Sequence, residues 1–110
     1  MTIALPRMSV EPTREEVDAL GGATLLEFGT SWCGYCRAAQ PRIAAALARH
    51  PGVRHVKVED GSGLRLGRSY GVTLWPTLVF LHEGKEASRL VRPTDTQAIA
   101  RALDEIDAPG

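Results

Sequence analysis

The two cysteines of this chain, Cys33 and Cys36, lie three residues apart in the segment Cys-Gly-Tyr-Cys. A disulfide between them would close a very small loop and would add little to the stability of the fold. Two thiols at this spacing are better suited to dithiol–disulfide exchange, in which one thiolate attacks a disulfide and the second thiol resolves the mixed disulfide. The segment therefore predicts a redox site rather than a structural bridge.

The elements on either side of this segment would place it at the start of a helix. Residues 24–28 form a short apolar run typical of a strand, and residues 34–49 have the alanine content and the spacing of a helix. The free N–H groups and the dipole of a helix N-terminus favour an anion, so we expect the pKa of the Cys33 thiol to fall below that of an ordinary cysteine. Pro41 lies inside this helix and should kink it.

The rest of the chain alternates between helix and strand patterns. Capping boxes at Thr13 and Thr94 predict the starts of the first and last helices. The other predicted elements are strands at 53–58, 76–81 and 86–91 and a short helix within 61–70. This order indicates an α/β fold, one domain over residues 1–110 with a mixed central sheet of four to five strands flanked by helices. Residues 1–12 either add an edge strand or remain loose.

The composition argues against several classes of partner. The chain has 13 lysines and arginines against 13 aspartates and glutamates, so its formal net charge is zero. It lacks the basic surplus that a nucleic-acid-binding protein uses to displace phosphate counterions. No apolar run approaches the roughly 18 residues of a membrane span, and the first twelve residues contain no signal-peptide-like stretch. We therefore expect a cytoplasmic protein that binds neither nucleic acid nor membrane.

Several motifs around the cysteines resemble those of thioredoxins, over roughly residues 13–106. They are the run from Phe28 to Cys36 (FGTSWCGYC), Pro41, the pair Gly71-Val72 and the triplet Trp75-Pro76-Thr77. The resemblance implies a thioredoxin fold and a thiol–disulfide oxidoreductase with Cys33 as the nucleophile and Cys36 as the resolving thiol. It also implies disulfide-containing client proteins, an unidentified reductant that restores the dithiol, and a monomer without a cofactor.

The resemblance further implies a substrate groove beside Cys33. Pro76 should be a cis-proline facing the cysteines, and residue 75 should offer backbone hydrogen bonds to an extended client. The predicted substrate-binding residues are Trp32, Gly34, Tyr35, Trp75, Pro76 and Arg92. Tyr35 stands where thioredoxins usually have proline, Trp75 where a smaller β-branched residue is common, and Arg92 in a loop that usually contains glycine. These departures predict a narrower range of clients.

A carboxylate and an amine complete the predicted site. Glu27 interrupts an apolar strand six residues before Cys33, where thioredoxins carry a buried acid, and Lys57 matches the usual partner of that acid. Burial raises the pKa of a carboxylate, and such a group can accept the proton of the resolving thiol Cys36. The alternative is that Glu27 reaches water at the end of the strand and that Lys57 lies on a solvated face.

Three other hypotheses compete with this assignment. Zinc binding by Cys33, Cys36, His50 and His55 would fit the spacing of a Cys2His2 site, but a Pro-Gly pair between the two histidines would break the helix that must carry both. We therefore expect no metal, and histidines at the solvated surface. The second hypothesis is a glutaredoxin-like protein, and the residues Trp32, Gly34 and Pro41 argue against it. A docking module without redox activity could use Trp75 as an anchor, although it would not need both cysteines.

Overall fold

The protein was analysed as a computed structural model that describes residues 11–107, and four helices and four strands alternate along this range. Their order is α1 (Arg14–Asp18), β1 (Ala23–Gly29), α2 (Gly34–Leu47), β2 (Arg54–Glu59), α3 (Arg65–Ser69), β3 (Thr77–His82), β4 (Lys85–Val91) and α4 (Thr96–Ile106). The predicted mixed sheet is confirmed, with four strands in this range. The prediction for residues 1–12 falls outside the described residues except for Glu11 and Pro12.

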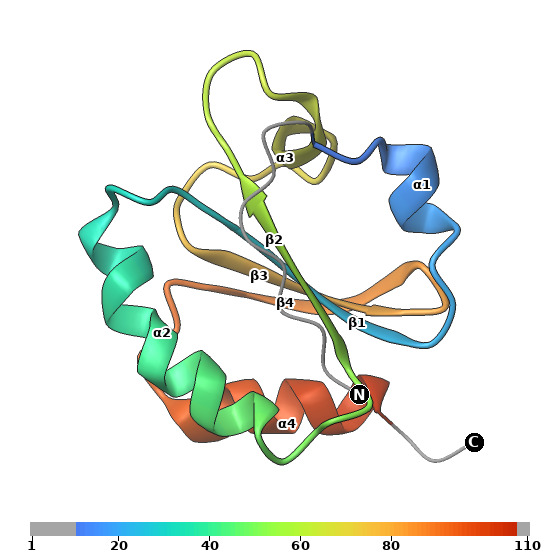
Figure 1. Cartoon of the computed structure of the whole chain (residues 1–110), viewed down its shortest axis with the longest axis vertical. Helices are drawn as coiled ribbons and strands as arrows, with labels where there is room; N and C mark the ends of the chain where they lie inside the picture. Colours follow the sequence, from blue (N-terminus) through green and yellow to red (C-terminus); the bar gives the residue numbers. More distant parts are fainter. Residues whose placement is uncertain (1–10, 108–110) are drawn as a thin grey trace.

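The strands form one sheet in the order β2-β1-β3-β4. The pair β1 and β2 is parallel, and the pairs β1–β3 and β3–β4 are antiparallel. Figure 1 shows α2 and α4 side by side on one face of the sheet and α1 and α3 on the other. Because both faces are covered, β1 and β3 are apolar at nearly every position rather than at every second one.

Each face of the sheet has its own core. Alternate residues of a strand point to opposite faces, so Leu25 packs with α2 and α4, whereas its neighbour Leu26 packs with α1 and α3. Leu78 and Val79 on β3 divide in the same way. No helix within residues 11–107 is long and apolar enough to cross a membrane.

The ends of the helices mostly follow the sequence signals. The capping box at Thr13 is present, because the Thr13 hydroxyl accepts from the Glu16 N–H and the Glu16 carboxylate accepts from the Thr13 N–H. The prediction for Thr94 is wrong. Asp95 caps α4 instead, and its carboxylate accepts from the Gln97 N–H at 3.0 Å. Thr and Asp are both good N-caps, and the second of the two adjacent candidates makes the bond.

Candidate active site

The two cysteines occupy the first turn of α2, directly after β1. Cys33 is the N-cap residue of this helix, and the backbone N–H of Cys36 donates to the Cys33 sulfur with an N···S distance of 3.2 Å. The side chains differ in exposure, since Cys33 is 7% exposed and Cys36 is 1% exposed. An incoming disulfide therefore meets the sulfur of Cys33 first, while Cys36 lies beneath it.

The surroundings of Cys33 favour its thiolate. Burial alone raises the pKa of the Cys33 thiol, but hydrogen bonds from Cys36 and from the Tyr35 N–H lower it, as does the positive charge of Arg92. The net result is a pKa below the ordinary value, as the helix N-terminus predicts. The Cys33 sulfur is therefore prepared for nucleophilic attack at a lower pH than a typical cysteine.

The main chain of Trp75 and Pro76 faces this sulfur. The Trp75–Pro76 peptide bond is cis, as predicted, and the Cys33 sulfur lies 4.0 Å from the Trp75 carbonyl oxygen. Pro76 is buried and directly precedes β3. The strand that follows Pro76 pairs with β1, which leads to Cys33, so neighbouring central strands of the sheet carry the two halves of the site.

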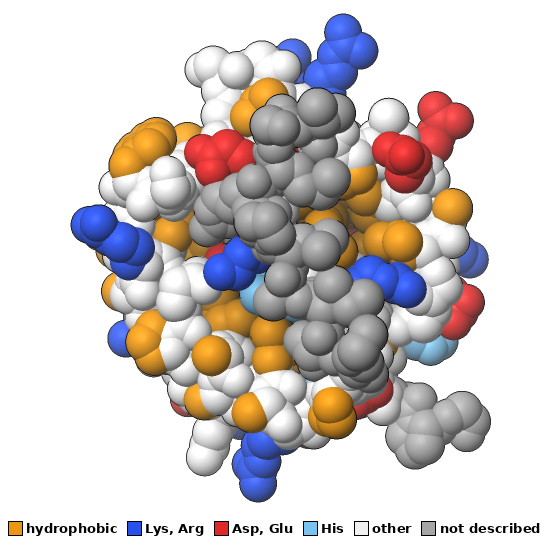
Figure 2. Space-filling model, in the orientation of Figure 1, with side chains coloured by type: hydrophobic (Ala, Val, Ile, Leu, Met, Phe, Trp, Pro, Cys, Tyr) orange, Lys and Arg blue, Asp and Glu red, His pale blue; other side chains and the backbone are white. Residues whose placement is uncertain are grey.

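An aromatic rim surrounds Cys33. Trp32 and Tyr35 are 69% and 60% exposed, and the rings of Trp32 and Trp75 pack edge to face with centroids 5.6 Å apart. The guanidinium carbon of Arg92 lies 4.0 Å from the centroid of the Tyr35 ring. Gly34, the remaining predicted residue, is exposed in the first turn of α2. Hydrophobic side chains also gather between the start of α2 and the loop after β2 in Figure 2.

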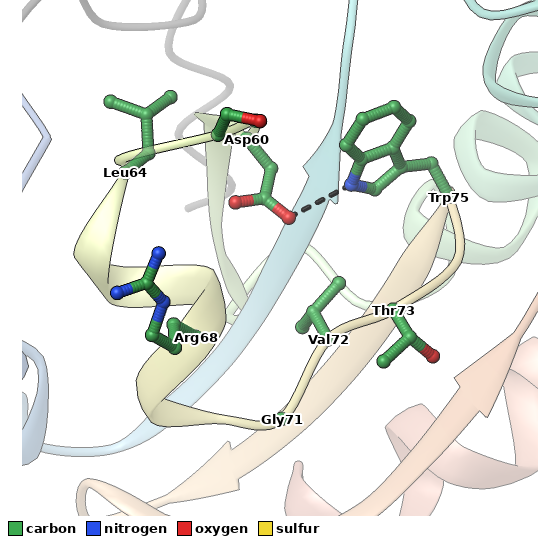
Figure 3. Close-up of a pocket in the computed structure, with 9 residues that line it drawn as sticks. Asp60, Leu64, Arg68, Gly71, Val72, Thr73 and Trp75 are labelled. Atoms are coloured by element: carbon green, nitrogen blue, oxygen red, sulfur yellow. Dashed lines mark hydrogen bonds between the residues drawn. The ribbon is translucent and has the colours of Figure 1, made fainter.

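Trp75 also borders a pocket of about 340 Å³ on the side of α3 (Figure 3). The indole Nε1 of Trp75 donates to the Asp60 carboxylate at 2.8 Å, and Arg68 of α3 lines the same pocket. Asp60 packs closely over Gly67, where a Cβ would overlap its carboxylate. An indole N–H that is removed from water usually has a hydrogen-bond acceptor, so an acceptor for Trp75 could be expected. The sequence alone does not identify Asp60 as that acceptor.

Glu27 lies on the opposite side of the cysteines, under α2. It is fully buried. One carboxylate oxygen of Glu27 is 2.7 Å from Nε2 of His55, and the other accepts from the Gln40 amide at 2.7 Å. Gln40 links this acid to Lys57, whose Nζ donates to the Gln40 amide oxygen at 2.9 Å. The alternative that Glu27 reaches water is therefore wrong, and the sequence missed His55 and Gln40 as its partners.

The expected pKa shift of Glu27 has the wrong sign. Burial raises the pKa of this carboxylate, as expected, but hydrogen bonds from His55 and Gln40 and the charges of His55 and Lys57 lower it. Together they outweigh the burial, and the pKa lies below the ordinary value of 4.5. Glu27 is consequently a buried carboxylate that remains ionised at neutral pH.

The expectation of surface histidines is also wrong for two of the three. His55 is buried against Glu27, and His50 is buried between Asp104 and Asp107, with nitrogen–oxygen distances of 2.9 and 2.8 Å. His82 is exposed, as predicted. The two buried rings thus pair with different carboxylates. Within residues 11–107 no group of three or more His, Cys, Asp and Glu side chains is arranged to hold a metal ion.

A cysteine pair at the start of a helix, facing a cis-proline across the end of a mixed sheet, defines a thiol–disulfide oxidoreductase. The thioredoxin family model matches residues 8–105, and the chain belongs to the thioredoxin family. A thioredoxin from Chlamydia trachomatis is 32% identical over 76% of this chain and 82% of its own length. Protein disulfide-isomerase A3 of Gallus gallus is 33% identical over 80% of this chain but only 18% of its own length.

A solved structure gives a fuller match. The reduced form of thioredoxin 2 from Pseudomonas aeruginosa superposes with a TM-score of 0.85 and 47% identity, covering 98% of this chain and 100% of that chain. These comparisons do not favour the glutaredoxin-like or docking alternatives. The protein is a thiol–disulfide oxidoreductase that acts as a protein-disulfide reductase on disulfide-containing substrates.

Proposed function

We propose that Cys33 is the attacking nucleophile and that Cys36 is the resolving thiol. The Cys33 thiolate attacks one sulfur of a client disulfide, forms a mixed disulfide and releases the other client sulfur as a thiolate. Cys36 then loses its proton and attacks the Cys33 sulfur, which releases the second client thiolate and leaves a Cys33–Cys36 disulfide. The observation that carries this assignment is the hydrogen bond from the Cys36 N–H to the more exposed Cys33 sulfur.

We also propose that Glu27 accepts the proton of Cys36. Its carboxylate is ionised because His55 and Gln40 hold it in the charged form, and an ionised carboxylate can act as a base. Gln40 also donates to the Cys36 carbonyl oxygen at 3.1 Å, so one side chain joins the acid to the first turn of α2. Lys57 supports the charge of Glu27 through Gln40.

The client binds as an extended segment in the groove formed by Trp32, Gly34, Tyr35, Trp75, Pro76 and Arg92. The Trp75 carbonyl lies beside the attacking sulfur, where a client strand could donate a backbone N–H to it, as in other cases of strand addition. The exposed rings of Trp32 and Tyr35 would cover the apolar parts of that segment.

We further propose that the protein works as a monomer in the cytoplasm. Each catalytic cycle oxidises Cys33 and Cys36 by two electrons in total, so turnover needs an external two-electron reductant. Both cysteines of the chain belong to this one pair, and a reducing compartment would keep them as the dithiol that attacks clients. Alkylation of intact cells with a thiol-specific reagent should label both cysteines, and a fully oxidised pair would contradict the proposal.

Insulin reduction by dithiothreitol tests the assignment of the cysteines. The wild-type protein should accelerate the precipitation of insulin chains, and Cys33→Ser should not. Cys36→Ser should hold clients on Cys33 as an adduct that survives denaturation and is released by dithiothreitol, whereas Cys33→Ser forms none. Absence of acceleration, with equal capture of clients by both variants, would indicate a docking module instead.

A further inference from the structure

Arg92 is held in an unusual conformation beside the cysteines. It follows β4 with a φ of 49°, in the left-handed region that residues other than glycine rarely adopt. Its backbone N–H donates to the Pro76 carbonyl at 2.9 Å, and its Nε donates to the Trp75 carbonyl at 2.9 Å. The guanidinium also covers the ring of Tyr35. These contacts fix a positive charge at the carbonyl that faces the Cys33 sulfur.

The outer part of this guanidinium is still available. A guanidinium carries five N–H donors, and only Nε is engaged. Within residues 11–107, the two terminal nitrogens of Arg92 have no hydrogen-bond or ion-pair partner. Asp60, the carboxylate that contacts Trp75, already accepts from the indole. A half-buried guanidinium with a spare planar pair of donors matches the geometry of a carboxylate, which it can bind through two parallel hydrogen bonds.

A client in the groove would bring its own side chains to this position. If the client segment runs beside Trp75, as in the proposed function, the residues next to its reacting cysteine pass over Tyr35 and Arg92. We propose that Arg92 is a specificity-determining residue, which selects protein disulfides with an aspartate or glutamate next to the attacked cysteine. This inference rests on the proposed function and adds the chemical class of the client.

The test uses three disulfide-linked peptides that differ only in the residue next to the attacked cysteine, which is Glu, Gln or Lys. The measured quantity is kcat/KM for each peptide at low salt. Wild-type protein should prefer the Glu peptide over the Gln peptide by about fivefold, the value of an ion pair of about 1 kcal/mol, and should disfavour the Lys peptide. The preference should weaken in roughly 0.5 M salt, which is well above physiological ionic strength, because salt screens partly exposed charges.

Substitutions at Arg92 locate the source of the preference. Arg92→Gln should remove the difference between the Glu and Gln peptides, and Arg92→Lys should keep a smaller one, because an ammonium cannot bind a carboxylate through a planar pair of donors. The ratio of two peptides on one variant cancels any change in the reactivity of Cys33. Arg101→Gln removes the same charge at an exposed position of α4 and should keep the wild-type ratio.

Several results would overturn the inference. Equal rates of the wild-type protein on the Glu and Gln peptides, with insulin still reduced, would contradict the selectivity and leave the proposed function intact. A preference that persists in Arg92→Gln would assign it to another residue. If Arg92→Gln changed kcat/KM only for the mixed disulfide of glutathione and for none of the peptides, Arg92 would recognise a small thiol, and our proposal would be wrong. Failure to reduce insulin or any peptide would contradict the proposed function itself.

Discussion

The two sides of the cysteine pair differ in how their charges are held. Beneath it, the buried side chains of Glu27 and His55 contact each other, and the half-buried Gln40 amide donates to the second carboxylate oxygen of Glu27. Above it, Arg92 lies among exposed aromatic rings with donors to spare. A charge in the interior interacts far more strongly than the same charge at the surface. The inner side is therefore suited to control proton transfer, and the outer side to choose the client.

The largest expected effect concerns the inner side, where removal of the buried Glu27 carboxylate should lower the stability of the protein. Glu27→Ala removes the acceptor of the buried His55 ring and one hydrogen-bond partner of the half-buried Gln40 amide. Breaking a buried charged pair by removing one partner typically costs about 3–5 kcal/mol, so we expect the free energy of unfolding to fall by about that amount. Urea denaturation at neutral pH measures it.

Two further measurements check this prediction. Glu105→Ala, at an exposed position of α4, should change the stability very little. Because the pKa of folded Glu27 is lowered from 4.5, its stabilisation is complete above that pH and is lost as the pH falls through the folded pKa. The stability gap between the wild type and Glu27→Gln should thus narrow in acid. A gap that stays constant would contradict the lowered pKa.

His55→Leu should slow the second chemical step. The hydrogen bond and charge of His55 lower the pKa of Glu27, so their loss raises it and leaves less carboxylate to accept the proton of Cys36. We therefore expect the resolution of the mixed disulfide to require a higher pH in this variant than in the wild-type protein. Rapid-mixing kinetics over a range of pH measure this, and His82→Leu is the exposed control. An unshifted pH profile would exclude Glu27 as the proton acceptor.

Tyr35→Pro should make the protein more reducing. The Tyr35 N–H lowers the pKa of Cys33, and proline has no N–H to donate. Loss of one hydrogen bond to a charged sulfur, about 1.5 kcal/mol, corresponds to a shift of about 30 mV toward a more negative potential. Equilibration with glutathione measures the potential. Tyr35→Phe keeps the N–H and the ring beneath Arg92, so it should match the wild type; a similar shift in both variants would contradict this explanation.

The smallest effect should come from the outer side. Trp75→Thr removes a large ring that narrows the groove, and we expect bulky protein disulfides to gain in kcat/KM by less than about tenfold relative to small ones. Trp75→Phe keeps most of the bulk of the ring but loses the hydrogen bond to Asp60 that holds it in place. Comparing the two variants therefore separates the effect of ring size from the effect of ring position. An unchanged client profile in Trp75→Thr would mean that the indole serves packing alone.

Much of the fold follows from the sequence because its signals are local. The apolar runs of β1 and β3, the cysteine pair at a strand–helix junction and the Trp75-Pro76 pair need only neighbouring residues to be interpreted. The pairing of His55 with Glu27 could not be predicted in this way. Alternation along β2 places residues 55 and 57 on one face, and polar residues on an alternating strand usually face water. Here α2 covers that face, and a carboxylate from the adjacent strand gives the imidazole its partner.

The two halves of the site also differ from the rest of the sheet in their expected hydrogen exchange. Cys33 follows β1, and Pro76 precedes β3, and these are the two inner strands of the sheet. Their amides are enclosed by a strand on each side and a helical layer on each face, so they should exchange with solvent only when the whole molecule unfolds. Among the strands of residues 11–107, β2 and β4 are the outer ones, and we expect their outward-facing amides to exchange through smaller openings. The reacting groups would then be joined to the part of the backbone that opens least often.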